Sequence, residues 1–182
     1  MRLDVSEILA NVGMRYPYEV DEPPIVDEDI ECAGPIQGRI VFANTGSVLL
    51  VRGAVHARVV MPCSRCLVYF ELPVDSPVEE GFALETRAVG ARGRQAQVVV
   101  VEEDENPDAG RLFDGPLFDL TELLRQHLML AMPLQPLHDE TCKGLCAQCG
   151  RNLNEGGCDC REVATHPALA RLADLLEDGP GR

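Results

Sequence analysis

The chain is poor in aromatic residues and in positive charge. It contains no tryptophan, and aromatic residues make up 4% of its 182 residues. Because proteins that bind single-stranded nucleic acid stack bases on aromatic side chains, this scarcity argues against such a platform. Its 30 acidic residues outnumber its 16 basic ones, so the chain, with a net charge of −14, repels nucleic-acid phosphates on average. Lys143 is the only lysine, and arginines supply the remaining positive charge.

Long apolar runs and a secretory leader are also missing. No stretch of the chain approaches the roughly 18 uninterrupted apolar residues that span a bilayer, so we expect no membrane partner. Residues 1–20 lack a charged leader followed by an apolar core and a cleavage site, and the predicted location is therefore the cytoplasm. In a reducing compartment, clustered cysteines are metal ligands or redox groups more often than structural disulfides.

Cysteine, by contrast, is concentrated, since five of the eight cysteines lie in the segment CKGLCAQCGRNLNEGGCDC. The spacing of Cys146 and Cys149 is that of a zinc knuckle, in which two thiolates on a tight turn converge on one ion. Cys158 and Cys160 supply two more sulfurs, and four thiolates at about 2.3 Å complete a tetrahedral, structural Zn²⁺ site. The spacing of this second pair is unusually tight and Cys142 is a fifth candidate, so either Cys142 or Cys160 is a spare.

A second cysteine pair, Cys63 and Cys66, follows a predicted strand. The pair therefore lacks the helix N-terminus that lowers the pKa of thiols in thioredoxin-like redox proteins. Together with His138 and Cys142 it would form a second zinc site, provided that the end of the sheet meets the segment after the first long helix. The alternative is that both cysteines are small residues in a strand turn.

Alternation of apolar and polar residues predicts a β-sheet that is antiparallel by its spacing. The expected strands cover residues 36–44, 48–61, 67–74, 78–84 and 97–102. The acidic segment 19–31 holds seven acids and no base. Because it also contains two adjacent prolines, it predicts an extended, solvated connector.

Two principal helices complete the prediction. The first covers residues 120–132 and begins at a capping box formed by Asp119 and Glu122. The second covers residues 165–176, and a short opening helix is expected over residues 4–13. The cysteine-rich segment lies between the two principal helices.

The predicted fold class is α+β, with an antiparallel β-sheet, two principal helices and a small zinc-knuckle-like Cys-rich segment. We expect an α+β core domain over residues 1–135. Residues 136–182 would then hold the zinc-binding segment and the C-terminal helix. Metal binding would fold this second part, because the segment is too polar to bury a core of its own.

Four segments of the chain carry a family resemblance. They are LDVSEIL, GAVHARVVMPCSRCLVYFELPV, LFDLTELLRQHLMLAMPLQPLH, and CKGLCAQCGRNLNEGGCDC followed by HPALARLADLL. In this order they resemble the bacterial YceD family of large-subunit ribosomal RNA accumulation proteins, and the resemblance runs nearly end to end. It implies a role in ribosome biogenesis, with a link to a small ribosomal protein of the large subunit. It implies no enzymatic activity and supplies no catalytic residues.

An acidic surface suits a basic partner. We therefore expect the direct partner to be a ribosomal protein or pre-ribosomal particle of the large subunit, bound through the acidic segments 19–31 and 102–108, and no small-molecule substrate. RNA contact would use the arginines of one strand face and one loop, namely Arg52, Arg58, Arg87, Arg92 and Arg94. For the strand residues, the alternative is an ordinary solvent-facing row.

Other functional classes stay open at this point. A thiol redox protein would form a reversible disulfide between Cys63 and Cys66 and bind no metal. An RNA-processing hydrolase would need carboxylates or histidines gathered on rigid elements, whereas the acids of this chain cluster in connectors. A zinc-dependent adaptor or transcription module is a further alternative.

Overall fold

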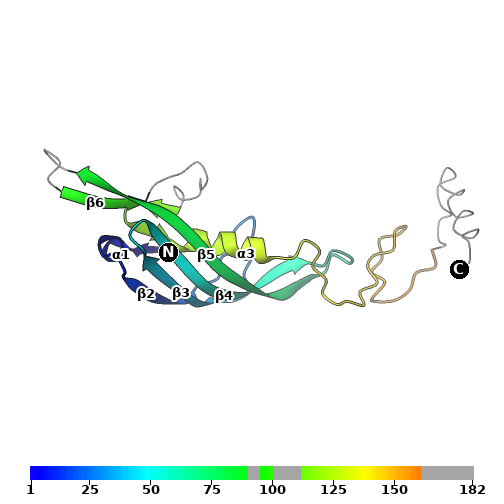
Figure 1. The fold of residues 1–182 in the computed structure, drawn as a ribbon. Helices are drawn as coiled ribbons and strands as arrows, with labels where there is room; N and C mark the ends of the chain where they lie inside the picture. The colour runs from blue at the N-terminus through cyan, green and yellow to red at the C-terminus, as the bar shows by residue number, and fades with distance from the viewer. Residues whose placement is uncertain (90–94, 101–111, 161–182) are drawn as a thin grey trace, which may run out of the picture.

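The structure is a computed structural model that describes residues 1–89, 95–100 and 112–160. Within these ranges the chain forms two antiparallel sheets, and its α+β class is as predicted (Figure 1). The larger sheet has the order β2-β3-β4-β5-β6, with strands Arg15–Glu22, Ile36–Asn44, Val48–Pro62, Tyr69–Val89 and Gln95–Val100. The smaller sheet has the order β1-β8-β7, with strands Arg2–Asp4, Leu117–Asp119 and Phe113–Asp114. The helices α1 and α3 cover Ser6–Ala10 and Leu120–Ala131.

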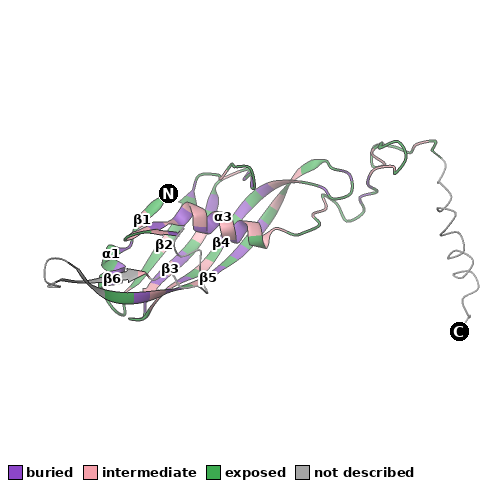
Figure 2. Ribbon diagram, turned by 90° about the horizontal axis from the view of Figure 1, so that it is seen from above, coloured by how far each residue is buried: buried purple, intermediate pink, exposed green. Residues whose placement is uncertain are grey.

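One face of the larger sheet is covered by α3 and the smaller sheet, while the other face is open to solvent (Figure 2). Strand β4 shows the reason, because its residues alternate between the two faces. Its apolar row is buried and comprises Leu49, Val51, Val55, Ala57 and Val59. Its polar row is exposed and includes Arg52, His56 and Arg58. The sequence pattern predicted this separation.

Aromatic rings from both sheets meet in the core. The ring of Phe118 in β8 lies 5.3 Å from that of Phe42 in β3 and 6.1 Å from that of Phe82 in β5. Helix α3 closes the core with its apolar stripe, and Leu120, Leu123, Leu124 and Leu128 are at most 1% exposed. The Asp119 side chain accepts a hydrogen bond from the Glu122 backbone N–H at 3.2 Å, so the predicted cap is present.

The acidic connector predicted for residues 19–31 is wrong in its first part. Residues 19–22 belong to β2, which pairs with β3 along its whole length. In this strand Glu19 and Asp21 occupy the exposed row, whereas Val20 and Glu22 face the core, where the Glu22 carboxylate accepts a hydrogen bond from the Tyr18 hydroxyl at 2.9 Å. The Glu19 carboxylate also pairs across the sheet with Arg39 at 3.3 Å. The acidic run concealed this alternation.

The number of strands that follow Cys66 also needs correction. The strands predicted over 67–74 and 78–84 form one strand, β5, which passes through Pro73 and Pro77. Between Tyr69 and Ala83 this strand pairs with β4 alone among the described strands, and the missing proline N–H groups fall on its other edge.

The opening helix is shorter than predicted. Because Asp4 lies in β1, α1 begins only at Ser6, whose backbone N–H donates to the Asp4 carboxylate at 2.9 Å. The side-chain amide of Asn11 donates a hydrogen bond to the Glu7 carbonyl at 2.8 Å, and the helix ends at Ala10.

The helix predicted over 165–176 lies outside the described residues. In the described part of the chain, no helix has the length and apolar character needed to cross a membrane.

Gly53 of β4 lies against the backbone of β3, with no room for a side chain. A Cβ atom on Gly53 would lie 2.0 Å from the carbonyl oxygen of Arg39. We therefore expect Gly53→Ala to lower the free energy of unfolding by about 1–3 kcal/mol, because the neighbouring strand must move. Gly81→Ala in β5 is the matched control, since its Cβ would meet the Val48 side chain at an ordinary 3.4 Å. Urea unfolding followed by circular dichroism measures both, and equal losses would contradict the steric explanation.

Candidate metal centres

The first candidate centre joins the end of the sheet to the segment after α3. Cys63 and Cys66 lie in the turn between β4 and β5, whereas His138 and Cys142 follow the helix. The ligand atoms of these four residues all lie within 4.8 Å of one another. The Ser64 backbone N–H donates to the carbonyl of Pro136 at 2.8 Å, so main chain also holds the two segments together. This is the meeting that the predicted second zinc site requires.

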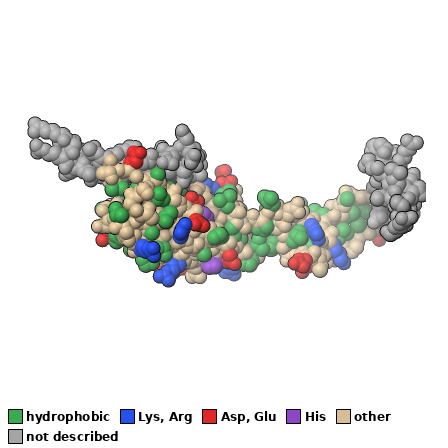
Figure 3. Space-filling model, in the orientation of Figure 1, with side chains coloured by type: hydrophobic (Ala, Val, Ile, Leu, Met, Phe, Trp, Pro, Cys, Tyr) green, Lys and Arg blue, Asp and Glu red, His purple; other side chains and the backbone are tan. Residues whose placement is uncertain are grey.

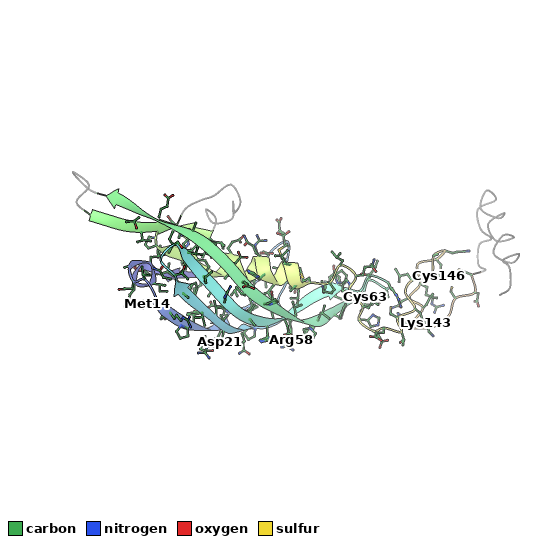
Figure 4. All side chains as sticks on the ribbon, viewed as in Figure 1. Met14, Asp21, Arg58, Cys63, Lys143 and Cys146 are labelled. Carbon is green, nitrogen blue, oxygen red and sulfur yellow. The ribbon has the colours of Figure 1, made fainter. Side chains whose placement is uncertain are left out.

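Local backbone geometry directs the sulfurs of this centre. The Leu67 N–H donates to the Cys63 carbonyl and the Cys63 N–H donates to the Val68 carbonyl, both at 2.9 Å. Leu67 has a φ of 61°, in the left-handed region, which turns the chain back toward β5. The three cysteines of the centre are at most 4% exposed and pack against Phe70, Leu137 and Leu145. Figure 4 shows Cys63 at the end of the sheet, with Lys143 and Cys146 following along the next segment.

The distances in this centre fit a tetrahedral ion. The Cys63 and Cys142 sulfurs are 3.8 Å apart, and the Cys66 sulfur is 3.4 Å from the Nδ1 atom of His138. Two thiolates bound to one ion at about 2.3 Å in tetrahedral geometry stand about 3.8 Å apart. A disulfide would need about 2.05 Å. The four donors are thus arranged as metal ligands rather than as a disulfide.

Hydrogen bonds prepare one thiol of this centre for metal binding. Burial acts to raise the pKa of the Cys63 thiol, but hydrogen bonding with His138 and nearby backbone groups lowers that pKa to about 5. The neighbouring Cys66 differs, because burial and the Cys63 and Cys142 thiols outweigh the backbone hydrogen bond at Val68 and raise its pKa. Since the thiolate is the metal-binding form, the centre offers one pre-formed ligand and completes the set as metal displaces protons.

The second candidate centre is the predicted knuckle. Cys146, Cys149, Cys158 and Cys160 place their sulfurs within 4.8 Å of one another. The Gly150 N–H donates to the Cys146 carbonyl at 2.9 Å, and a φ of 70° at Gly150 curls the chain under the sulfurs. Cys149 and Cys160 are exposed and the other two are half-buried, so this centre is much more open than the first.

Backbone hydrogen bonds also act on the thiols of the knuckle. The N–H groups of Cys149 and Gln148, followed by the neighbouring thiols, lower the pKa of Cys146 to about 6. The Cys149 thiol and burial raise the pKa of Cys160 to about 12. A tight turn with N–H groups aimed at its first sulfur therefore stabilises a thiolate at Cys146, as a metal-binding turn requires.

Each of the five clustered cysteines has a place in one centre or the other. Cys142 lies with Cys63 and Cys66, and Cys160 lies with the other cysteines of the knuckle. The sequence predicted that one of these two would be a spare cysteine outside any metal site, but each belongs to a candidate centre.

The remaining cysteine, Cys32, was not singled out from the sequence, because no other cysteine or histidine lies near it in the chain. It is 4% exposed and belongs to the main core, and burial raises the pKa of its thiol.

Of the arginines proposed for RNA contact, the two whose side chains the structure describes are paired with acids. Arg52 and Arg58 lie on the exposed face of β4, but they pair with Glu79 at 2.8 Å and Glu71 at 3.1 Å. Figure 3 shows acidic and basic side chains interspersed over the sheet. Arg87 belongs to β5. Arg92, Arg94 and the acidic segment 102–108 lie outside the described residues.

Comparisons with known proteins identify relatives of the chain. An uncharacterized protein of Mycobacterium leprae is 30% identical over 148 residues, which cover 81% of this chain and 62% of that protein. An uncharacterized protein of Mycobacterium tuberculosis is 29% identical over 92% of this chain and 69% of its own length. The Arabidopsis thaliana protein named large ribosomal RNA subunit accumulation protein YCED homolog 1, chloroplastic, is 24% identical over 96% of this chain and 57% of that protein.

The chain thus spans less than two thirds of the Mycobacterium leprae and Arabidopsis relatives. No solved structure matches it. Residues 51–176 match the family described as large ribosomal RNA subunit accumulation protein YceD. This match includes both candidate metal centres and covers more than half of the chain, which therefore belongs to the YceD family.

Proposed function

We propose that the chain is a non-enzymatic ribosome biogenesis factor that supports accumulation or processing of large-subunit ribosomal RNA. The observation that carries this proposal is the family match over residues 51–176, together with the printed name of the Arabidopsis relative. The direct partner is a basic ribosomal protein or a pre-ribosomal particle of the large subunit. The contribution of the metal centres is structural.

The donor sets support structural zinc. Three cysteines with one histidine, and four cysteines, are the sets that Zn²⁺ prefers in structural sites, whereas Ca²⁺ and Mg²⁺ prefer oxygen ligands. Each set supplies four protein ligands, which fill a tetrahedral ion and leave no position for a reacting water. Bound zinc would hold the chain in place at both centres.

The distribution of charge supports a protein partner over direct RNA binding. The arginines of β4 are already paired with acids, so phosphate contact there would require those pairs to open. The loop between β2 and β3 exposes four acids, namely Asp27, Glu28, Asp29 and Glu31. Asp29 pairs with Arg125 of α3 at 3.3 Å, which ties this loop to the helix. A loop of this charge attracts a basic protein surface and repels phosphate.

Charge reversal on this loop tests the partner. We expect Glu28→Lys with Glu31→Lys to weaken binding of purified basic large-subunit ribosomal proteins several-fold at low salt, because rim charges steer association. The control is Glu7→Lys with Glu140→Lys, which makes the same change in net charge at exposed positions outside the loop. Pull-down or biosensor titration measures both variants. Equal weakening by the two would indicate a nonspecific charge effect and contradict an interface at the loop.

Metal content tests the two zinc sites. We expect protein purified without chelator to hold two Zn²⁺ ions per chain, because the described residues offer two separate four-donor sets. Cys63→Ser and Cys146→Ser should each lose one ion, since each removes a ligand from a different set. Elemental analysis with native mass spectrometry gives the count. Protein without metal would overturn this assignment and favour the thiol redox alternative.

The cellular role has a direct measurement. In cells that lack the gene for this chain, the ratio of large-subunit to small-subunit ribosomal RNA should fall and should recover when the wild-type gene is returned. Complementation with the Cys63→Ser variant tests whether zinc at the first centre is needed for this recovery. A normal ratio in the deletion strain would contradict the proposed function, whatever the metal content of the protein.

A further inference from the structure

One side chain joins the two metal centres. Asn154 lies in the loop between Cys149 and Cys158, and this loop belongs to the second centre. Its amide nitrogen Nδ2 lies 3.4 Å from the sulfur of Cys142, a ligand of the first centre. A residue held by one set of cysteines thus contacts the sulfur of the other.

Neighbouring groups fix the orientation of this amide. The Oδ1 atom of Asn154 accepts a hydrogen bond from the backbone N–H of Lys143 at 2.8 Å. Since the amide nitrogen is a donor, only the amide oxygen can accept this bond. The Nδ2 atom also donates to the Oδ1 atom of Asn152 at 2.8 Å. Asn152 is oriented in turn, because its own Nδ2 donates to Glu155 at 3.0 Å. The Asn154 amide therefore aims an N–H group at the Cys142 sulfur.

The main chain supports the same contact. The Leu153 N–H donates to the carbonyl of Gly144 at 2.9 Å, and Leu145 forms a β-bridge with Asn152. Residues 142–145 therefore lie against the loop that carries Asn154. The Leu145 N–H also donates to the carbonyl of Arg65 at 3.1 Å, which ties this pairing to the turn that holds Cys63 and Cys66.

A hydrogen-bond donor directed at a ligand sulfur increases the affinity of the site for its metal. An N–H group directed at a metal-bound thiolate stabilises the negative charge on sulfur and fixes the direction of the ligand. Loss of such outer-shell partners typically lowers metal affinity about 10–100-fold. The loop that positions Asn154 contains few apolar residues and is closed by the four sulfurs of the second centre.

We propose that Asn154 couples the two centres, so that zinc at the second centre strengthens zinc binding at the first. This inference depends on the zinc assignment made above. Asn154 acts as a positioning residue, because it contacts a ligand and not the ion. By thermodynamic linkage, zinc at the first centre strengthens binding at the second by the same factor.

The test compares zinc affinity at the first centre in four full-length proteins, by competition with a zinc chelator. They are the wild type, Asn154→Asp, a Cys146→Ser/Cys149→Ser variant that lacks the second centre, and the combination of all three changes. Asn154→Asp keeps the oxygen that accepts from Lys143 but places a carboxylate oxygen against the sulfur. We expect Asn154→Asp and the loss of the second centre each to lower affinity about tenfold. The combined variant should show no further loss, because both changes remove the same contact.

Control variants separate this effect from damage to the loop. Arg151→Gln makes the same one-unit change in net charge in the same loop, at an exposed side chain outside the hydrogen bonds that orient Asn154, and should leave affinity at the first centre within about twofold of wild type. In a Cys63→Ser/Cys66→Ser background, Asn154→Asp should leave zinc at the second centre in place. If the aspartate disturbs folding, Asn154→Ala removes the donor without adding charge and should lower affinity in the same direction.

The possible outcomes are distinct. Wild-type affinity in Asn154→Asp would overturn the coupling, and so would an undiminished effect of Asn154→Asp after loss of the second centre. Two bound zinc ions that dissociate independently would overturn the coupling while leaving the zinc assignment intact. Protein that binds no zinc would overturn the zinc assignment itself.

Discussion

The described segment after α3, up to residue 160, is held to the rest of the structure by the docking of residues 136–145 against the turn between β4 and β5. The main core is built from the two sheets and α3, and Cys32 is the only cysteine in it. Among the described residues beyond the helix, the buried apolar cluster consists of three cysteines packed against Phe70, Leu137 and Leu145. So small a cluster stabilises little by apolar burial alone, and a zinc ion bound by the four converging donors, as proposed above, would hold the segment in position.

The two centres differ in what holds their ligands before metal arrives. Cys63 and Cys66 lie on a turn between two strands of the sheet, so half of the first set is positioned by structure that needs no metal. The second set lies wholly within a polar segment, with two of its sulfurs exposed. Since ordering a chain costs conformational entropy, ordering the ligands of the first centre costs less than ordering those of the second.

Much of the fold follows from local patterns, and its exceptions have physical causes. The alternation in β4 and the cap of α3 could be predicted because each depends on neighbouring residues. Strand β2 was missed because acids occur on both of its rows, with Glu19 and Asp21 exposed and Glu22 buried, and this acidic run resembles a solvated connector. The partner of Cys142 could not be chosen from spacing, because Cys63 lies 79 residues away and only the folded sheet brings the two sulfurs together. The role of Asn154 likewise depends on a contact between two turns.

The open face of the sheet shows why net charge alone is a poor guide to the partner. Its arginines face acids on adjacent strands, at 3.3 Å for Arg39 with Glu19 and 2.8 Å for Arg52 with Glu79. Exposed pairs of this kind contribute only about 0–1 kcal/mol each to stability, but they cancel the local field of both partners. The loop between β2 and β3 differs, because its exposed Glu28 and Glu31 form no ion pair with another described residue and can attract a basic surface. This loop lies against α3 through Asp29 and Arg125, and the same helix leads to the first metal centre. A partner bound at the loop would therefore lie beside the helix that leads to the candidate metal centres.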